Sequence, residues 1–452
     1  MDGYLPFRSL DIAVIGAGIS GLSASWLLSK LHNVTLYEQE NAPGGHSHTV
    51  QVSERDSLVD VDTGFIVYNE QNYPQFTELL QHLEVSTQPA PMSFSYSLSN
   101  GELEYCGSGL NGLFGQRKNL FNRKVWRLLR DLIRFYNESE SKAALAPSNL
   151  TVGQFLAENQ YSESFIDLHL VPMISAIWST SGQTALQVPI SSVVKFFSNH
   201  GLLKLRNRPS WRTILHGSHT YVWRLLNETG TKIQLGREIG SVSRSDSGVI
   251  LRDIHGSALK HDVVVLATHA DQALRLLSHP TGQERRLLGN FLYANNKVVL
   301  HSDESLMPSL KKLWSSWNVR STNKTSDPLT VTYWMNKLQN LNCQRNYFVS
   351  LNPPSIAHST QLHSEFSYSH PTLNSRMISS QHELHAIQGK NNTWFCGSYF
   401  GYGFHEDALV SGLQVAEALG AKRPWWAKPT GGRPRHNVHP RQEYSASVAV
   451  DA

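Results

Sequence analysis

The sequence is poor in cysteine, in net charge and in long apolar runs. Its 452 residues contain three cysteines, Cys106, Cys343 and Cys396, which stand far apart and form no CxxC pair. We therefore expect neither a disulfide framework nor a bound metal, and a reducing compartment such as the cytoplasm fits best. The formal net charge of +4 is too small for this length to favour nucleic acid as a partner.

Membrane-spanning and secretory signals are also missing. No apolar run approaches the ~18 residues of a spanning helix, and residues 1–10 lack the apolar core of a signal peptide. We therefore expect a soluble or membrane-peripheral protein. The composition, 40% hydrophobic and 17% charged, is that of an ordinary globular chain, and its length predicts about two or three domains.

The periodicity of the apolar residues predicts an α/β chain that begins with a strand, a helix and a second strand. Residues 263–267 form a continuous apolar run, which is typical of a parallel strand buried on both faces. In order, the expected elements are a strand at 10–15, a helix at 19–31, a strand at 34–37, a helix at 73–83, short strands within 84–110, helices over 151–200, strands within 329–352 and 393–398, and a helix at 404–419.

The strongest motif is the turn Gly16-Ala17-Gly18-Ile19-Ser20-Gly21, which follows the first strand and opens the first helix. In that context Gly16 permits a tight turn, Gly18 lets a pyrophosphate approach the backbone, and Gly21 lets helix and strand pack closely. The helix start at Ile19 and Ser20 offers free N–H groups and a partial positive charge to phosphates. The motif therefore predicts a Rossmann-type dinucleotide site.

Glu38 ends the second expected strand, 20 residues after Gly18. An acidic side chain there binds the ribose hydroxyls of a dinucleotide and disfavours the 2′-phosphate of NADP. The turn and the acid together leave FAD and NAD open.

Further segments resemble the FAD-dependent amine oxidase superfamily, which includes phytoene desaturases and protoporphyrinogen oxidases. The resemblance implies that FAD is the cofactor. It also implies that His46 stands where the family has an arginine, and Tyr399 where it has a glutamate. The matching residues are Gly44, Gly45 and His46 for the pyrophosphate, Asp62, Gly64 and Phe65 for the ribityl chain and flavin, Ile239 for adenine, and Gly397, Gly403, Phe404, His405 and Glu406 for the flavin edge.

A narrower resemblance rests on four runs, at 46–50, 62–70, 176–180 and 401–407. They are similar to amine-oxidase-like proteins often encoded beside cyclopropane-fatty-acid synthases, and the similarity extends from about residue 10 to 420. It implies work on fatty-acyl chains, for example desaturation of a methyl-branched chain, and a lipid-modifying enzyme as a partner.

The order of these segments predicts the fold class: α/β, with a discontinuous Rossmann-type FAD-binding domain and an inserted α+β substrate domain, as in amine oxidases. The predicted boundaries are 9–90, 215–275 and 390–420 for the FAD-binding domain, 91–214 (largely helical) and 276–389 for the substrate domain, and 421–452 for a disordered tail.

Three residues are candidates for catalysis. Lys297 occupies a position that resembles the amine oxidase lysine holding a water at flavin N5; the alternative is an exposed lysine at a strand end. His48 and His405 follow cofactor motifs, where a histidine acts as a base or as a hydrogen-bond donor, or is structural. Tyr68, Trp178 and Tyr402 either line the substrate pocket or belong to the core.

The segment 117–136 is basic and amphipathic. Arginines recur at helical spacing, and large apolar residues fall on another face. One interpretation is a helix on a membrane surface that reaches lipid substrates; the other is an ordinary helix with solvated arginines.

The sequence leaves three functions open. The leading hypothesis is an FAD-dependent oxidoreductase that removes a hydride from, or desaturates, a lipid-like or fatty-acyl substrate. The alternatives are an FAD-dependent amine oxidase and a flavin-binding scaffold for a lipid-modifying partner. No nucleic-acid partner is expected in any of the three.

Overall fold

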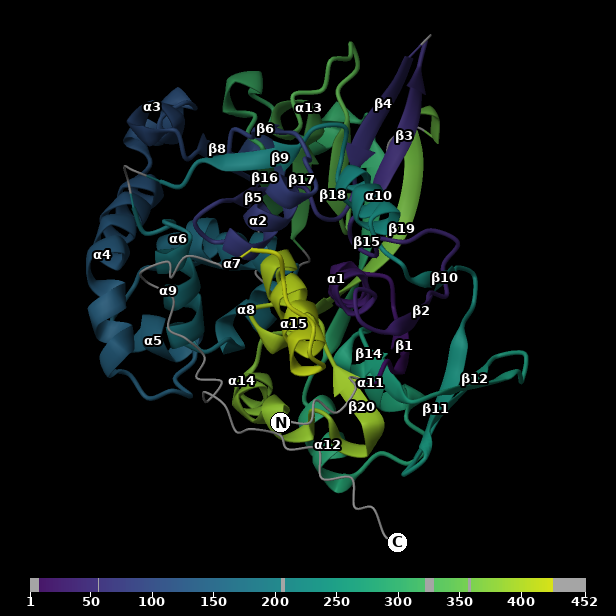
Figure 1. The fold of residues 1–452 in the computed structure, drawn as a ribbon. Coiled ribbons are helices and arrows are strands. Elements are labelled where there is room, and N and C mark those ends of the chain that lie inside the picture. The colour runs from purple at the N-terminus through teal and green to yellow at the C-terminus, as the bar shows by residue number, and fades with distance from the viewer. Residues whose placement is uncertain (1–7, 56, 205–207, 322–328, 357–358, 426–452) are drawn as a thin grey trace, which may run out of the picture.

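The computed structural model describes residues 8–55, 57–204, 208–321, 329–356 and 359–425 (Figure 1). Two helices lie at the centre, α1 (Ile19–Leu28) and α15 (His405–Ala418). A parallel sheet, a larger mixed sheet and a block of helices surround them.

The parallel sheet joins strands from both ends and the middle of the chain. Its edge at the carboxyl ends of the strands is well defined, because Ile15 lies level with Tyr37 on one side and with Leu266 on the other. Ligands of open α/β sheets bind outside this edge. The strand order is β10 (Lys232–Gln234), β2 (Asn33–Tyr37), β1 (Asp11–Ile15), β14 (Val263–Leu266) and β20 (Thr393–Phe395).

Small residues let α1 and α15 pack closely. A Cβ on Gly412 would collide with the Ser20 carbonyl oxygen, and Ser23 Oγ donates to the Leu409 carbonyl at 3.5 Å. Each helix begins among residues that border the cavity described below.

The mixed sheet is built from two stretches of chain, 94–106 and 293–371. Its neighbouring strands are antiparallel except for β16 and β7, which pair in parallel. The order is β19 (Leu362–Pro371), β15 (Tyr293–His301), β18 (Phe348–Leu351), β17 (Thr330–Trp334), β16 (Trp317–Ser321), β7 (Phe94–Leu98) and β8 (Leu103–Cys106).

Smaller sheets accompany the two main ones. They consist of β11 (Ile239–Ser245), β12 (Gly248–Asp253) and β13 (Ala258–His261); β3 (Thr49–Glu54) and β4 (Ser57–Asp62); and β5 (Tyr68–Asn69), β9 (Trp211–Ile214) and β6 (Thr87–Pro89).

Most of the helices form a block on one side of the molecule, where α4 runs along the outer edge (Figure 1). The helices besides α1 and α15 are α2 (Pro74–His82), α3 (Gly109–Leu113), α4 (Arg123–Leu145), α5 (Val152–Glu158), α6 (Glu163–Phe165), α7 (Val171–Trp178), α8 (Gly182–Gln187), α9 (Ile190–Asn199), α10 (His219–Asn227), α11 (Ala270–Leu276), α12 (Gly282–Leu288), α13 (Met335–Leu338) and α14 (Ser375–Glu383).

This architecture confirms the predicted fold class, because one parallel sheet takes its strands from three separate segments. The first strands and the first and last helices begin and end within a few residues of the expected positions. The predicted domain boundaries stay predictions.

The prediction of a disordered tail from residue 421 is wrong for residues 421–425. Trp425 stacks on Trp26 with ring centroids 5.8 Å apart, and its indole donates to Gln75 Oε1 at 3.0 Å. Arg423 pairs with Glu417. The rest of the predicted tail, 426–452, lies outside the described residues.

Across the part of the chain that the structure describes, no helix has the length and apolar character needed to cross a membrane. The basic segment predicted at 117–136 folds as a 3₁₀ turn, Arg117–Phe121, followed by the first half of α4. Val125, Leu128 and Phe135 of α4 are buried, so the helix has the amphipathic character expected.

Candidate cofactor and substrate site

The glycine-rich turn between β1 and α1 has no room for larger residues at two of its three glycines. Gly16 has a φ of +102°, and a Cβ there would lie 2.8 Å from the Ala267 carbonyl oxygen. A Cβ on Gly21 would collide with the Gly16 carbonyl oxygen. A Cβ on Gly18, by contrast, would meet no atom of the described residues within 4 Å. Gly18 therefore borders open space, where a ligand can approach the backbone.

The N-terminus of α1 faces this space without a cap. Among the described residues, no side chain bonds the N–H groups at Gly18, and the first turn contains no acidic residue. Gly18, Ile19 and Ser20 all line the cavity. Free N–H groups and the positive end of the helix dipole suit a pyrophosphate at this point.

Glu38 stands beside the turn, at the carboxyl end of β2. Its Oε2 accepts the Ala17 N–H at 2.7 Å, and its Oε1 accepts the Glu40 N–H at 3.0 Å. A carboxylate accepts about four hydrogen bonds, so lone pairs remain for ribose hydroxyls. Ile239, the first residue of β11, lines the same end of the cavity.

The double glycine, Gly44 and Gly45, packs directly against the glycine-rich turn between β1 and α1. The Gly44 N–H donates to the Ala17 carbonyl at 2.8 Å, and a Cβ on Gly45 would lie 3.2 Å from Gly18 Cα. Gly44 has a φ of +123°, and a Cβ there would lie 2.6 Å from the Ser47 carbonyl oxygen. Both glycines are therefore required for the two loops to meet.

Further along the cavity, Phe65 lies against the start of α15. The Phe65 N–H donates to the His46 carbonyl at 2.7 Å, and a Cβ on Gly64 would collide with that same carbonyl. The Phe65 ring stacks on the His405 ring, with centroids 3.8 Å apart and an interplanar angle of 8°.

Two carboxylates in the first turn of α15 bind different parts of the chain. Asp407 Oδ2 accepts the N–H groups of Tyr402 and Phe404 at 3.0 Å each, which fixes the loop before the helix. Glu406 accepts the N–H groups of Gln75 and Phe76 at 2.9 Å each, and so caps α2 instead of facing the cavity. Glu406 was predicted as part of the helix start whose backbone N–H groups face the flavin edge. Its side chain is not part of the cavity wall, and the backbone contact stays a prediction.

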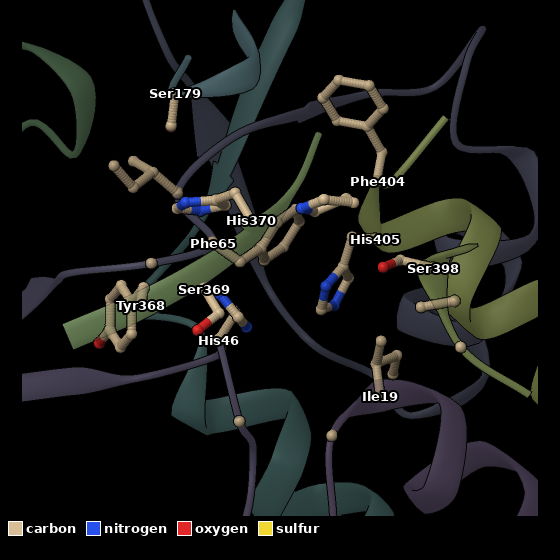
Figure 2. Close-up of a pocket in the computed structure, with 18 of the residues that line it drawn as sticks. Ile19, His46, Phe65, Ser179, Tyr368, Ser369, His370, Ser398, Phe404 and His405 are labelled. Carbon is tan, nitrogen blue, oxygen red and sulfur yellow. The ribbon is translucent and has the colours of Figure 1, made fainter. Parts of the chain in front are cut away.

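These segments enclose one continuous cavity of about 970 Å³, a size at the upper end of ligand and cofactor pockets. Figure 2 shows His46, Tyr368, His370 and His405 around one open space. The predicted cofactor residues that line it are Gly16, Gly18, Ile19, Ser20, Glu38, Gly44, Gly45, His46, Gly64, Phe65, Ile239, Gly397, Gly403, Phe404 and His405.

The wall beyond the flavin-edge segments is mostly apolar. Trp178 and Tyr402 line it as predicted, whereas Tyr68 is buried in the core. Phe196 lies in an aromatic stack, 4.8 Å from the Phe404 ring and 3.8 Å from the His200 ring. Further apolar wall residues are Met92, Phe94, Met173, Ile177, Leu202 and Trp317.

Neutral histidines border the cavity near its middle. Burial, together with the neighbouring His370 and His269 imidazoles, lowers the pKa of His46 to about 3, and burial lowers that of His370 to about 4. The Asn296 amide donates to His370 Nδ1 at 3.1 Å, which leaves the proton on Nε2. His46 Nε2 is buried and has no hydrogen-bond partner among the residues that the structure describes.

A hydrogen-bonded triad connects this wall to His48. The Tyr368 hydroxyl lies 2.8 Å from both Thr63 Oγ1 and His48 Nδ1. Tyr368 and Thr63 line the cavity, whereas His48 stands behind them. Burial raises the pKa of Tyr368 to about 12 and lowers that of His48. The arrangement can pass a proton from the cavity through the Tyr368 hydroxyl to a neutral imidazole.

His405, the other histidine predicted to act in catalysis, is held on several sides. Its Nε2 lies 2.9 Å from the Tyr221 hydroxyl, which in turn lies 2.6 Å from Ser47 Oγ. Burial lowers the pKa of His405 to about 3, so the imidazole is neutral at physiological pH and a weak base. It lines the cavity as a fixed polar wall.

Two predicted site residues lie elsewhere. Lys297 is not among the cavity residues; its Nζ pairs with Glu365 at 2.8 Å on the exposed face of β15. Asp62 lies behind the wall, where its Oδ1 accepts Ser218 N–H and Thr49 Oγ1 at 2.8 and 2.6 Å, and burial raises its pKa to about 6. Lys297 therefore has the exposed strand position that was the alternative interpretation, and the Asp62 carboxylate does not border the cavity.

The residues present fit FAD. The uncapped helix and Gly18 accommodate the pyrophosphate, and Glu38 has lone pairs for the ribose. His46 Nε2 and Tyr399 Oη, both at the cavity, are buried and have no partner in the described part of the chain, which a bound ligand would supply. The sequence reasoning missed Tyr368 and His370, although the alternation of aromatic residues at 366, 368 and 370 marks one face of a strand.

The sequence model of the flavin containing amine oxidoreductase family matches residues 19–420 of this chain. The chain belongs to this family. It is therefore an FAD-dependent oxidoreductase. No curated protein matches the chain in sequence.

Solved structures share the fold at low sequence identity. A putative protoporphyrinogen oxidase from Exiguobacterium sp. 255-15 is 14% identical, with a TM-score of 0.66 over 91% of this chain and 99% of that one. A CLA-producing fatty acid isomerase from P. acnes is 15% identical, with a TM-score of 0.63 over 90% and 98%. A putrescine oxidase variant is 14% identical, with a TM-score of 0.65 over 92% and 99%.

Proposed function

We propose that this flavoenzyme removes a hydride from a hydrophobic, lipid-like substrate and desaturates a fatty-acyl chain. The observation that carries the proposal is the apolar wall of the cavity beyond Phe404, lined by residues such as Met173, Ile177 and Trp317. Such a wall gains free energy by taking apolar surface out of water. A fatty acid isomerase among the similar structures supports the compatibility of this fold with acyl chains.

The charges around the cavity support an acyl chain over an amine. Among the described residues, the carboxylates of the cavity wall are Glu38 and Glu238, both at the nucleotide end beside β2 and β11. An ammonium group at the other end would be buried without a counter-ion, which is costly. Arg208, an exposed residue of the cavity wall, suits the carboxylate or phosphate head of a lipid.

Amine oxidation is the second candidate, because the aromatic residues of the cavity could contact a cation through their faces. In this chain, however, the Phe196 ring stacks on the Phe404 ring at 4.8 Å and on the His200 ring at 3.8 Å. Those ring faces cover one another, which supports an apolar wall more than a site for an ammonium group.

FAD supplies the hydride acceptor when bound. Desaturation also releases a proton from the adjacent carbon, and Tyr368 is the hydroxyl placed to take it. As Tyr368 accepts that proton, its own proton passes over 2.8 Å to His48 Nδ1, and His48 can release its Nε2 proton to solvent. The route requires His48 to be neutral, and burial favours this state by lowering its pKa.

The experiment is a turnover assay on purified holoenzyme with saturated and methyl-branched fatty acids and phospholipids, in parallel with a panel of primary and secondary amines. We expect an acyl product that has lost two hydrogen atoms, detected by mass spectrometry. As a control, Ile177→Trp should narrow the apolar end and stop turnover while FAD stays bound, since Ile177 is a partly exposed residue of the wall on α7. Oxidation of an amine with no change in any lipid would refute the proposal.

A further inference from the structure

We propose that one surface of this protein docks on bilayers that contain anionic lipid. The surface, called the basic apolar surface here, consists of Leu110, the 3₁₀ turn Arg117–Phe121 and the outer face of α4 from Arg123 to Ile133. Figure 1 shows α3 and α4 at the outer edge of the molecule.

Large apolar side chains project from this surface into water. Phe121 is 90% exposed and Trp126 is 50% exposed, and Leu110, Leu120 and Ile133 are exposed as well. Such clustering on a soluble surface marks an interaction site. Trp126 is also fixed in place, because its indole donates to the Leu120 carbonyl at 2.8 Å and its ring packs 5.1 Å from Phe114.

The charge of the surface has one sign. Residues 117–130 contain six cationic side chains and no acidic one, whereas the whole chain has a formal net charge of +4. The rest of the chain is therefore net negative, by 4 − 6 = −2. The acid that follows, Asp131, is buried and paired with Arg130 at 3.0 Å. The six cations are Arg117, Lys118, Arg123, Lys124, Arg127 and Arg130.

Both properties together point to a lipid surface. Cations attract anionic headgroups, while exposed Trp and Phe side chains insert at the boundary between headgroups and acyl chains. A helix with a basic polar face and exposed aromatic residues lies in the plane of such an interface. A nucleic acid would use the cations but would leave the exposed leucines and Ile133 in water.

The surface lies close to one end of the cavity. Arg208 lines the cavity and lies beside the Tyr136 hydroxyl of α4. Tyr136 follows Trp126 by ten residues on the same helix, a distance of about 15 Å. Docking would therefore bring that end of the cavity near the acyl chains of the bilayer. This link to substrate delivery rests on the proposed function, whereas the docking itself does not.

The test is co-sedimentation of the holoenzyme with vesicles of phosphatidylcholine alone and of phosphatidylcholine with about 30% phosphatidylglycerol. We expect binding to the anionic vesicles that weakens as salt is added. Phe121→Ser should weaken it about tenfold or more, because an apolar side chain leaves the interface. Arg127→Gln should weaken it about fivefold.

Matched controls exist on other surfaces. Trp223 on α10 is 52% exposed, and Trp223→Ser should leave vesicle binding unchanged, as should Arg286→Gln at an exposed ion pair. Equal binding to neutral vesicles, equal loss in the control variants, or binding to double-stranded RNA but not to vesicles would overturn the proposal. Turnover of detergent-dispersed substrate is followed in parallel: loss of vesicle binding with turnover intact separates this proposal from the proposed function.

Discussion

Replacement of Gly18 by alanine should separate cofactor binding from folding. Gly18 has φ −71° and ψ 176°, values that alanine adopts without strain, and its Cβ would meet no atom within 4 Å in the described part of the chain. The added methyl group would instead occupy the space in which the pyrophosphate approaches the backbone. We expect a protein that folds normally and holds FAD weakly.

The size of the loss follows from the crowding. Forcing one methyl group into a close-packed contact costs about 1–3 kcal/mol, which corresponds to a roughly 5- to 150-fold weaker affinity for FAD. Affinity can be measured by titrating apoprotein with FAD and following the flavin fluorescence, and folding by the melting temperature of the apoprotein.

Gly282→Ala is the matched control. Gly282 also has open space around its Cβ position, but it lies at the start of α12 outside the cavity. It should leave both melting temperature and FAD affinity unchanged. If Gly18→Ala bound FAD within twofold of the unaltered protein, the assignment of the pyrophosphate to this turn would be refuted.

Three further changes test other parts of the site. Tyr368→Phe should lower turnover roughly 100-fold or more with FAD affinity unchanged. Turnover of the unaltered enzyme should fall in acid with an apparent pKa below 6.5, because His48 becomes protonated. A flat pH profile would exclude the relay. Lys297→Met should leave flavin reoxidation by O₂ unchanged, because Lys297 pairs with Glu365 away from the cavity; slower reoxidation would restore its predicted role. Since burial holds the pKa of His405 near 3, below its unfolded value of 6.5, its contribution to apoprotein stability should be lost as pH falls through this window, by about 1.4 kcal/mol per pH unit. Urea unfolding between pH 7 and 4.5 measures this, and His405→Gln should reduce the slope by that amount, while the remainder from His46 and His370 persists.

The nucleotide end of the site could be predicted from the sequence because the residues that form it lie close together in the chain. The turn at Gly16 to Gly21 and the acid at Glu38 fall within one strand-helix-strand unit, so spacing alone places them together. The resemblance at Gly44, Gly64 and Gly403 extended this to distant segments, and each of these residues lines the cavity.

Lys297 illustrates a feature that could not be predicted from the sequence, namely which face of a strand a residue occupies. Side chains alternate between the faces of a strand, so a shift of one residue exchanges inside and outside. On β15, Lys297 points to the exposed face and pairs with Glu365, whereas its neighbour Asn296 is buried and bonds His370. The motif predicted which segment forms the strand, but it did not predict the register, which decides which residue faces the cavity.

The chemistry of the cavity wall depends on contacts between distant elements. Tyr368 on β19 meets Thr63 and His48 only because the mixed sheet packs against the segment after the double glycine. The low pKa of His46 likewise depends on burial and on His370, which lies 324 positions away. No pattern within either segment encodes these pairings.

Anaerobic reduction of the bound flavin by a substrate tests the central claim most directly. Purified holoenzyme is mixed without oxygen with single fatty acids and phospholipids, and separately with single amines, while the visible flavin absorbance is followed. We expect a lipid to bleach the flavin and the amines to leave it unchanged. Bleaching by an amine, with every lipid inert, would contradict a lipid substrate and assign this cavity to amine oxidation.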